Sequence, residues 1–373
     1  VVACGYALLT KVFPASLDAA DPFGRLRTPF DYWNATGLMA AMGLPVCLWA
    51  GARPVSGRVL RALTVPAIAI LTTALMLSYS RGALLAALVG LGCWFALVPL
   101  RLRAVLVLVL GAAGGAIATV WALAHHAITH DNQALTARTT AGHDFGLVLL
   151  IVVILSALAG LAAMLGMDRI RVSARLRHRI GTALVVLVAL VPFAVIAGAA
   201  ASSRGLTGEV SHAWHTLTSA KATGVGDTAG RLGQLGNSRG LYWREGLKVG
   251  EHALLAGVGA GGFDTARTRY TTNPLQVAHA HSYLIETFAD FGLIGVALTL
   301  ALFVAWARAC RRTLAVAPED GRGRHAEERT GLLTLLAVVV TFGVSSLIDW
   351  TWFVPGVAVP ALVAAGWLAG RGP

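Results

Sequence analysis

Charged residues are scarce in this sequence. Only 13% of its residues are Asp, Glu, Lys or Arg, while 56% are hydrophobic, and the mean hydropathy is +0.70. Soluble domains carry roughly 25% charged residues, so this composition excludes an ordinary soluble protein and predicts an integral membrane protein. Long apolar runs separated by short polar joints predict helices, because the strands of a membrane barrel would alternate apolar and polar residues.

Cysteine is also scarce. The four cysteines are Cys4, Cys47, Cys93 and Cys310, and no two of them form a C-x-x-C pair. The first three lie inside apolar runs, where we expect them to be buried small hydrophobic residues. This pattern suggests neither a disulfide framework nor a zinc site, and nothing in the sequence signals a cofactor.

The apolar runs predict an all-α, polytopic membrane bundle that forms a single domain over residues 1–373. We expect about ten transmembrane helices, the first of them truncated, because a span needs about 20 residues and the first run is shorter. That run is interpreted as the end of a helix that begins upstream. The runs are Val1–Thr10, Trp33–Ala50, Ala62–Tyr79, Ala83–Leu100, Ala104–Ala124, Phe145–Met167, Ile180–Ala200, Phe291–Ala309, Leu332–Ile348 and Val354–Ala369.

The distribution of arginine predicts the topology. The net charge is +12, and the joints between the apolar runs alternate between short, basic joints and longer, mixed ones. Cytoplasmic loops collect Lys and Arg, so the basic joints are expected in the cytoplasm and the mixed joints on the outer face. This rule places the long segment 201–280 outside the membrane.

The segment 201–280 is the longest polar stretch of the chain. At about 80 residues it exceeds an ordinary connection, which makes it functional or disordered. Its first part, through Gly236, is rich in Gly, Ser, Thr and Ala and is expected to be mobile. Its second part predicts a helix over Ser238–His252 that lies on the membrane surface, with Trp243, Leu247 and Val249 as apolar contacts.

The segment 201–280 has a net positive charge, although the positive-inside rule expects the excess of Lys and Arg in cytoplasmic loops. It is either a solvated loop of a length exempt from the rule or a funnel for an anion. The planar fork of arginine suits phosphate oxygens and keeps its charge. The basic residues of the loop are Arg204, Lys221, Arg231, Arg239, Arg244, Lys248, Arg267 and Arg269.

Ser80-Arg81-Gly82 is a very tight outward turn between two apolar runs. Arg81 is its only charge. The side chain could simply extend to the interface, but a phosphate bound at membrane depth would also need such a charge, and Gly82 allows a close backbone approach.

Two glycine and histidine patterns follow later in the chain. The run 257–262 fits G-x-G-x-x-G by letter, but it lacks the βαβ context of a dinucleotide site, so a tight re-entrant turn is favoured. His279 and His281 follow at the mouth of a membrane helix, and imidazole can exchange a proton near neutral pH. Their spacing does not suit a shared metal, and we expect none. No carboxylate pair nearby stands out as a metal clamp, and Asp18, Asp21 and Asp349 are only weak alternatives.

These patterns, in this order, resemble the O-antigen ligase superfamily, which includes O-antigen polymerases and bacterial protein O-oligosaccharyltransferases. The resemblance spans residues 25–295. Ser282, Asp290 and Ala253 depart from the residues that many members have, which leaves the subfamily open. The matching motifs are Arg25-Leu26…Pro29…Trp33-Asn34-Ala35, Ser80-Arg81-Gly82-Ala83, Ser238-Arg239…Trp243, Leu255-Ala256-Gly257-Val258-Gly259…Phe263 and His279-Ala280-His281-Ser282…Leu284…Gly292-Leu293-Ile294-Gly295.

The resemblance implies a metal-independent, inverting glycosyltransferase in the bacterial inner membrane. Such enzymes move a glycan from undecaprenyl diphosphate to an acceptor hydroxyl on the extracytoplasmic face. The acceptor is a glycan, lipid or protein, membrane lipids surround the enzyme, and no nucleic acid takes part. Arg81 and Arg239 then match the arginines that grip the diphosphate, and His281 matches the general base.

Further substrate contacts are expected from other residues of the same motifs and loop. We expect these contacts from Arg25, Arg244, Arg267, Arg269 and His279.

The alternative function is a transporter or flippase of a lipid-linked or other anionic substrate. A transporter should place charges or helix breaks at mid-membrane in paired segments, whereas here the polar groups gather at one face. A receptor or scaffold would leave the arginine and histidine residues unexplained. The sequence therefore favours interfacial chemistry.

Overall fold

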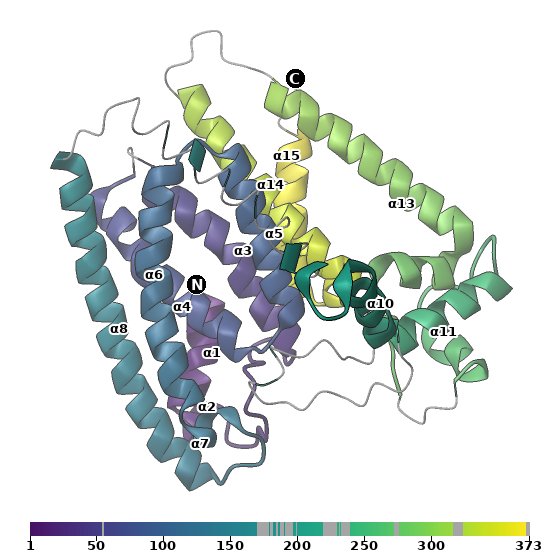
Figure 1. Ribbon diagram of the computed structural model, residues 1–373, viewed down its shortest axis with the longest axis horizontal. Coiled ribbons are helices and arrows are strands. Elements are labelled where there is room, and N and C mark those ends of the chain that lie inside the picture. Colours follow the sequence, from purple (N-terminus) through teal and green to yellow (C-terminus); the bar gives the residue numbers. More distant parts are fainter. Residues whose placement is uncertain are drawn as a thin grey trace.

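The computed structural model describes residues 1–53, 56–169, 200–218, 239–271, 276–315 and 324–370, with isolated positions between 179 and 198 and at 230 and 232. Every element in these ranges is a helix (Figure 1). In chain order the helices are α1 (Val2–Val12), α2 (Pro14–Leu17), α3 (Trp33–Ala52), α4 (Arg58–Leu77), α5 (Arg81–Leu97), α6 (Arg101–Leu123), α7 (His126–Thr129), α8 (Leu135–Arg169), α10 (Gly205–Thr218), α11 (Arg239–His252), α12 (Phe263–Ala266), η2 (Arg267–Arg269), α13 (Tyr283–Ala315), α14 (Arg324–Ile348), η3 (Thr351–Phe353) and α15 (Pro355–Gly370).

The first group of helices packs around α4. Helix α4 contacts α3, α6 and α8, and α6 also packs on α8. Small residues bring these helices together: a Cβ added at Gly111 or Gly115 of α6 would collide with Ile68 or Thr72 of α4. Close backbone approach through glycine is typical of helix packing in membranes, where van der Waals contact drives association.

The second group joins the two ends of the chain. Helix α14 packs on α5, α3 and α15, so the C-terminal helices close against the N-terminal bundle. Gly90 of α5 lies directly against Thr341 of α14. This packing brings the end of α14 to the same end of the bundle as the starts of α3 and α5.

Helix α13 extends away from the bundle and carries the outer helices α11 and α12 at its first end (Figure 1). It is two helices joined at Gly292, where φ is 60° and ψ is −155°. That conformation is essentially restricted to glycine. The first part of α13, through Phe291, is therefore free to take a direction different from the membrane-spanning part.

The helical membrane prediction is confirmed in its coarse form. Within the described residues, six helices are long and apolar enough to cross a membrane, and α1, α5 and α15 are shorter apolar helices. These nine helices coincide with predicted apolar runs. The remaining run, Ile180–Ala200, lies largely outside the described residues, so the number of spans stays a prediction.

The segment 201–280 differs in part from its prediction. Within the first part, which was expected to be mobile, Gly205–Thr218 form the helix α10, and nearly all of residues 219–238 lie outside the described residues. The helix expected over Ser238–His252 is confirmed as α11. Val249 packs as predicted, but Leu247 is exposed, and Tyr242, which the sequence did not single out, is buried instead.

Candidate functional site

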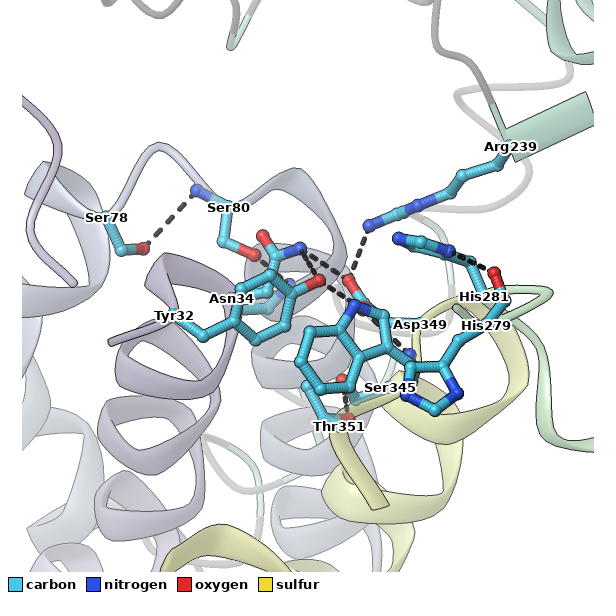
Figure 2. Close-up of polar contacts among 12 residues, drawn as sticks. Tyr32, Asn34, Ser78, Ser80, Arg239, His279, His281, Ser345, Asp349 and Thr351 are labelled. Atoms are coloured by element: carbon cyan, nitrogen blue, oxygen red, sulfur yellow. Dashed lines mark hydrogen bonds and ion pairs between the residues drawn. The ribbon is translucent and has the colours of Figure 1, made fainter. Parts of the chain in front are cut away.

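A buried carboxylate, Asp349, lies at the centre of the site, directly after α14. It accepts hydrogen bonds from the Tyr32 hydroxyl, the Asn34 amide and the backbone N–H of Trp350, the last at 2.8 Å. Its fourth partner is Arg239, whose Nη2 lies 2.5 Å from Oδ2 (Figure 2). The side chain is only 2% exposed, so these four donors take the place of its hydration.

Tyr32 remains protonated in this network. Burial and the neighbouring Asp349 carboxylate raise the pKa of Tyr32 well above its ordinary value. The hydroxyl therefore donates to Asp349 and accepts from Asn34 at 2.8 Å. These two residues lie at the start of α3, and together they anchor the start of α3 to the end of α14.

The two predicted phosphate-binding arginines each begin a helix at this point. Ser80 caps α5 by accepting from the Ala83 N–H at 3.2 Å, and Arg81 is the first residue of that helix. Arg239 is the first residue of α11. A Cβ built on Gly82 would lie 3.7 Å from Nη1 of Arg239, so the Arg239 guanidinium lies close to the first turn of α5. Helix N-termini carry partial positive charge that favours an anion.

His281 lies beside this arginine (Figure 2) and has an unusual backbone. Its φ is +55°, a left-handed conformation that costs energy for a bulky residue and is often found at functional sites. The backbone carbonyl accepts from the Trp243 indole at 3.3 Å, and the ring packs on Tyr242 with centroids 5.2 Å apart. Contacts from α11 thus support the strained residue.

The protonation state of His281 follows from its surroundings. Burial lowers the pKa of His281, Arg239 lowers it further, and Asp349 opposes them by raising it. Nδ1 lies 2.9 Å from the carbonyl oxygen of His279, which can only accept, so Nδ1 carries a proton. The neutral ring then has its lone pair on Nε2, the form that a general base requires.

His279 forms a second ordered imidazole. Its Nδ1 lies 2.8 Å from Oε1 of Glu286, and the other oxygen of Glu286 accepts from the Ala280 N–H at 3.0 Å. The ring stacks on Trp350 and Phe353, with centroids 5.0 and 4.4 Å away. The Glu286 carboxylate and the rings of Trp350 and Phe353 therefore hold His279 in place, and the backbone N–H of Trp350 also donates to Asp349.

The glycine-rich run 257–262 forms a turn packed against the kink of α13. The Asp290 carboxylate accepts from the N–H groups of Gly261 and Phe263 at 2.8 and 3.0 Å. A Cβ on Gly257 would collide with the backbone of Asp290. The tight turn expected from the sequence is present, and it fixes the first part of α13 to the outer loop.

Two of the predicted substrate-binding arginines are buried in contacts with the protein. The guanidinium of Arg25 is fully buried, donates to the Ser78 carbonyl at 3.0 and 3.2 Å, and lies over the Trp33 ring. Arg267 forms a buried ion pair with Glu245 at 2.7 Å. These contacts fit support of the site better than direct substrate contact.

The other two lie on the outer elements. Arg244 is on the exposed side of α11, and Arg269 is exposed in η2. The structure thus brings together Arg239, His279, His281 and the start of α5, while Arg244 and Arg269 lie on the exposed surfaces of α11 and η2.

The sequence reasoning missed several residues of this network. Asp349 was considered only as a weaker alternative, and Asn34 only as part of a motif. Tyr32, Glu286 and Trp350 were not singled out. Glu286 carried a usable signal, since it is an acidic residue in the first turn of a predominantly apolar helix.

A groove of about 410 Å³ runs along α13 opposite η3. The end beside Tyr283, Glu286 and Asp290, at the start of α13, is here called the upper end and is formed by aromatic and acidic side chains. The opposite end, beside Ile294 and Leu298, is here called the lower end and is apolar. The residues that line it are Ala256, Tyr283, Glu286, Thr287, Asp290, Phe291, Ile294, Gly295, Leu298, Thr299, Trp352 and Phe353. Across the part of the chain that the structure describes, no three His, Cys, Asp or Glu side chains gather as a metal site.

The comparisons with known proteins give a family match over part of the chain. The family model described as O-antigen ligase matches residues 145–300, which contain Arg239 and His281 but not Arg81 or Asp349. No curated protein matches the chain significantly. The match covers less than half of the chain, and together with the apolar helices it supports a multi-pass membrane protein that resembles O-antigen ligases. It confirms the resemblance of this chain to the O-antigen ligase superfamily.

Proposed function

We propose that this protein transfers a glycan from undecaprenyl diphosphate to an acceptor hydroxyl on the extracytoplasmic face of a bacterial inner membrane. The observation that carries the proposal is the Asp349 network, because it places a fixed arginine beside a neutral histidine. An arginine suits the phosphate oxygens of a donor, and a neutral histidine suits the hydroxyl of an acceptor.

The donor diphosphate binds between the starts of α5 and α11. Arg81 and Arg239 contact its oxygens, the two helix N-termini add partial positive charge, and Gly82 leaves room for the approach. Asp349 holds the Arg239 guanidinium in place before the donor arrives. Preorganised charge of this kind stabilises the negative charge that develops on the leaving diphosphate without reorganisation during the reaction.

His281 acts on the acceptor. The acceptor oxygen attacks the anomeric carbon from the face opposite the diphosphate, so the configuration inverts. The bond from the anomeric carbon to the phosphate oxygen breaks, and its electron pair leaves with the diphosphate. The acceptor proton passes to Nε2 of His281. Such general-base assistance contributes typically about 10²–10⁴-fold to the rate.

The test is a transfer assay with the full chain in lipid nanodiscs. The donor is a fluorescent oligosaccharide on undecaprenyl diphosphate, and transfer is followed with a panel of hydroxyl-bearing acceptors. We expect Arg81→Ala and Arg239→Ala to abolish transfer. Arg81→Lys should recover little, because a point charge replaces a bidentate fork. Lys248→Ala, an exposed cation on α11, is the matched control and should remain active.

The same assay separates the two histidines. We expect His281→Ala to lose transfer at matched expression, and His279→Ala to retain a measurable part of it. An active His281→Ala protein together with an inactive His279→Ala protein would contradict the assignment of the base. Normal donor binding and turnover in both arginine→alanine variants would contradict the donor site.

A further inference from the structure

The groove along α13, here called the α13 groove, has a chemistry opposite to that of the donor site. Two carboxylates, Glu286 and Asp290, line its upper end. Each accepts two hydrogen bonds from the protein, whereas a carboxylate has about four acceptor positions. This end of the groove therefore repels a diphosphate and retains acceptor capacity for hydroxyl groups.

The same end is faced by aromatic rings. Tyr283 and Trp352 meet edge to face with centroids 5.4 Å apart, and Trp352 lies 5.2 Å from Phe353. The face of an aromatic ring is electronegative, so it attracts the weakly positive C–H groups on one side of a sugar ring. Small-molecule sites are commonly lined by aromatic side chains with a few placed polar groups, and here those polar groups are hydrogen-bond acceptors.

The α13 groove is also connected to the predicted base. Glu286 lines the groove and holds His279, and the carbonyl of His279 accepts from Nδ1 of His281. Phe353 lines the groove as well and stacks on His279. His279 therefore contacts two lining residues of the groove on one side and His281 on the other.

From these contacts we propose that the upper end of the α13 groove is the acceptor subsite and that it takes an uncharged, hydroxyl-bearing sugar ring. The inference rests on the proposed function and adds the chemical class of the acceptor. The carboxylates accept from the sugar hydroxyls, the rings cover one face of the sugar, and His279 forms the boundary with the donor side. An isoprenoid chain is the poorer occupant, because it would press hydrocarbon against two carboxylates.

The substitution that tests this is Thr287→Trp, which places a large side chain in the groove and leaves both carboxylates in the sequence. Leu284→Trp is the matched control, since Leu284 lies one turn earlier on α13, is exposed and does not line the groove. The full chain in nanodiscs is examined by saturation-transfer NMR with chitotriose as the neutral sugar, trigalacturonate as the acidic sugar and farnesyl diphosphate as the isoprenoid probe. This measurement reports binding without requiring transfer.

We expect chitotriose to bind the unaltered chain and the Leu284→Trp variant, and to bind Thr287→Trp about tenfold more weakly, a change of about 1.4 kcal/mol. Trigalacturonate should give little signal. Equal chitotriose binding in all three proteins, no chitotriose binding to any, or loss of farnesyl diphosphate binding in Thr287→Trp would each overturn the inference.

The transfer assay distinguishes this inference from the proposed function. With chitotriose as acceptor, Thr287→Trp should raise the acceptor KM about tenfold and leave the donor KM unchanged. An unaltered chain that binds chitotriose at the groove but transfers nothing from any polyprenyl-diphosphate donor would refute the proposed function and support the sugar site. A rise in donor KM alone would refute the acceptor assignment.

Discussion

Replacing Asp349 by alanine would remove the acceptor that four groups share. Tyr32 and the Trp350 N–H lose their partner in a buried site, and Arg239 loses its counter-ion. Asn34 keeps one contact, to the Tyr32 oxygen. Each buried donor left unsatisfied costs about 1–3 kcal/mol, and breaking a buried ion pair costs about 3–5 kcal/mol. These costs overlap, so we expect Asp349→Ala to destabilise the fold by about 3–5 kcal/mol.

Thermal unfolding of the purified protein, followed by intrinsic tryptophan fluorescence, measures this loss. In a chain of this size a kilocalorie shifts Tm by only a few degrees, so a fall of about 5 °C or more is expected. Asp349→Asn keeps the shape and one acceptor oxygen and should fall by less. Asp264→Ala removes an exposed carboxylate of α12 and should stay close to the unaltered protein.

A double-mutant cycle with Asn34→Ala tests whether the network acts as a unit. Residues in one hydrogen-bonded network show coupling of about 0.5–3 kcal/mol, whereas independent sites add. The reasoning fails if Asp349→Ala melts with the unaltered protein, or if its effect simply adds to that of Asn34→Ala.

Three further expectations can be checked independently. Because burial lowers the pKa of His281, transfer should rise with pH through a midpoint below the ordinary histidine value of about 6.5 and then level off. Asp349 raises that pKa, so Asp349→Asn should move the midpoint of the residual activity to lower pH. A move to higher pH would contradict the electrostatic argument. Gly292→Ala forces a side chain onto a backbone with φ of 60° and against the Leu255 carbonyl, so Tm should fall by several degrees, while Gly343→Ala in α14, with nothing within 4 Å of the added Cβ, should not. Cysteines introduced at the exposed positions Ser203 and Ala315 should react differently with an impermeant thiol reagent in intact cells, Ser203→Cys strongly and Ala315→Cys weakly; the reverse order would overturn the topology.

The sequence predicted the helices well because membrane helices are read from uninterrupted apolar runs. It predicted α13 less well. The apolar run begins at Phe291, but the helix begins at Tyr283. Its first part carries Glu286 and Asp290, whose partners lie at 279–280 and 261–263. Contacts of that kind stabilise a polar helix start and are invisible to hydropathy.

The site was predictable where position in the topology decides it. The roles expected for Arg81, Arg239 and His281 come from the motifs that resemble the O-antigen ligase superfamily, and the alternation of basic and mixed joints predicts only that the three residues share one face of the membrane. Asp349 was not predictable in this way, because its partners Tyr32 and Asn34 lie 317 and 315 positions away in the chain. The sequence around a single aspartate at the end of an apolar run does not predict hydrogen-bond partners so far away in the chain.

The adjacency of Asp349 and Trp350 has a consequence for altering the selectivity of this protein. Asp349 holds the arginine on the donor side, and Trp350, the next residue, stacks on the histidine that borders the α13 groove. Under the proposed function, this one peptide unit supports both substrate sites through Arg239 and His279, so a substitution at either position is expected to disturb donor and acceptor recognition together. Changes meant to exchange one sugar for another without loss of donor use belong on the groove face of α13, which the Asp349 hydrogen bonds do not reach.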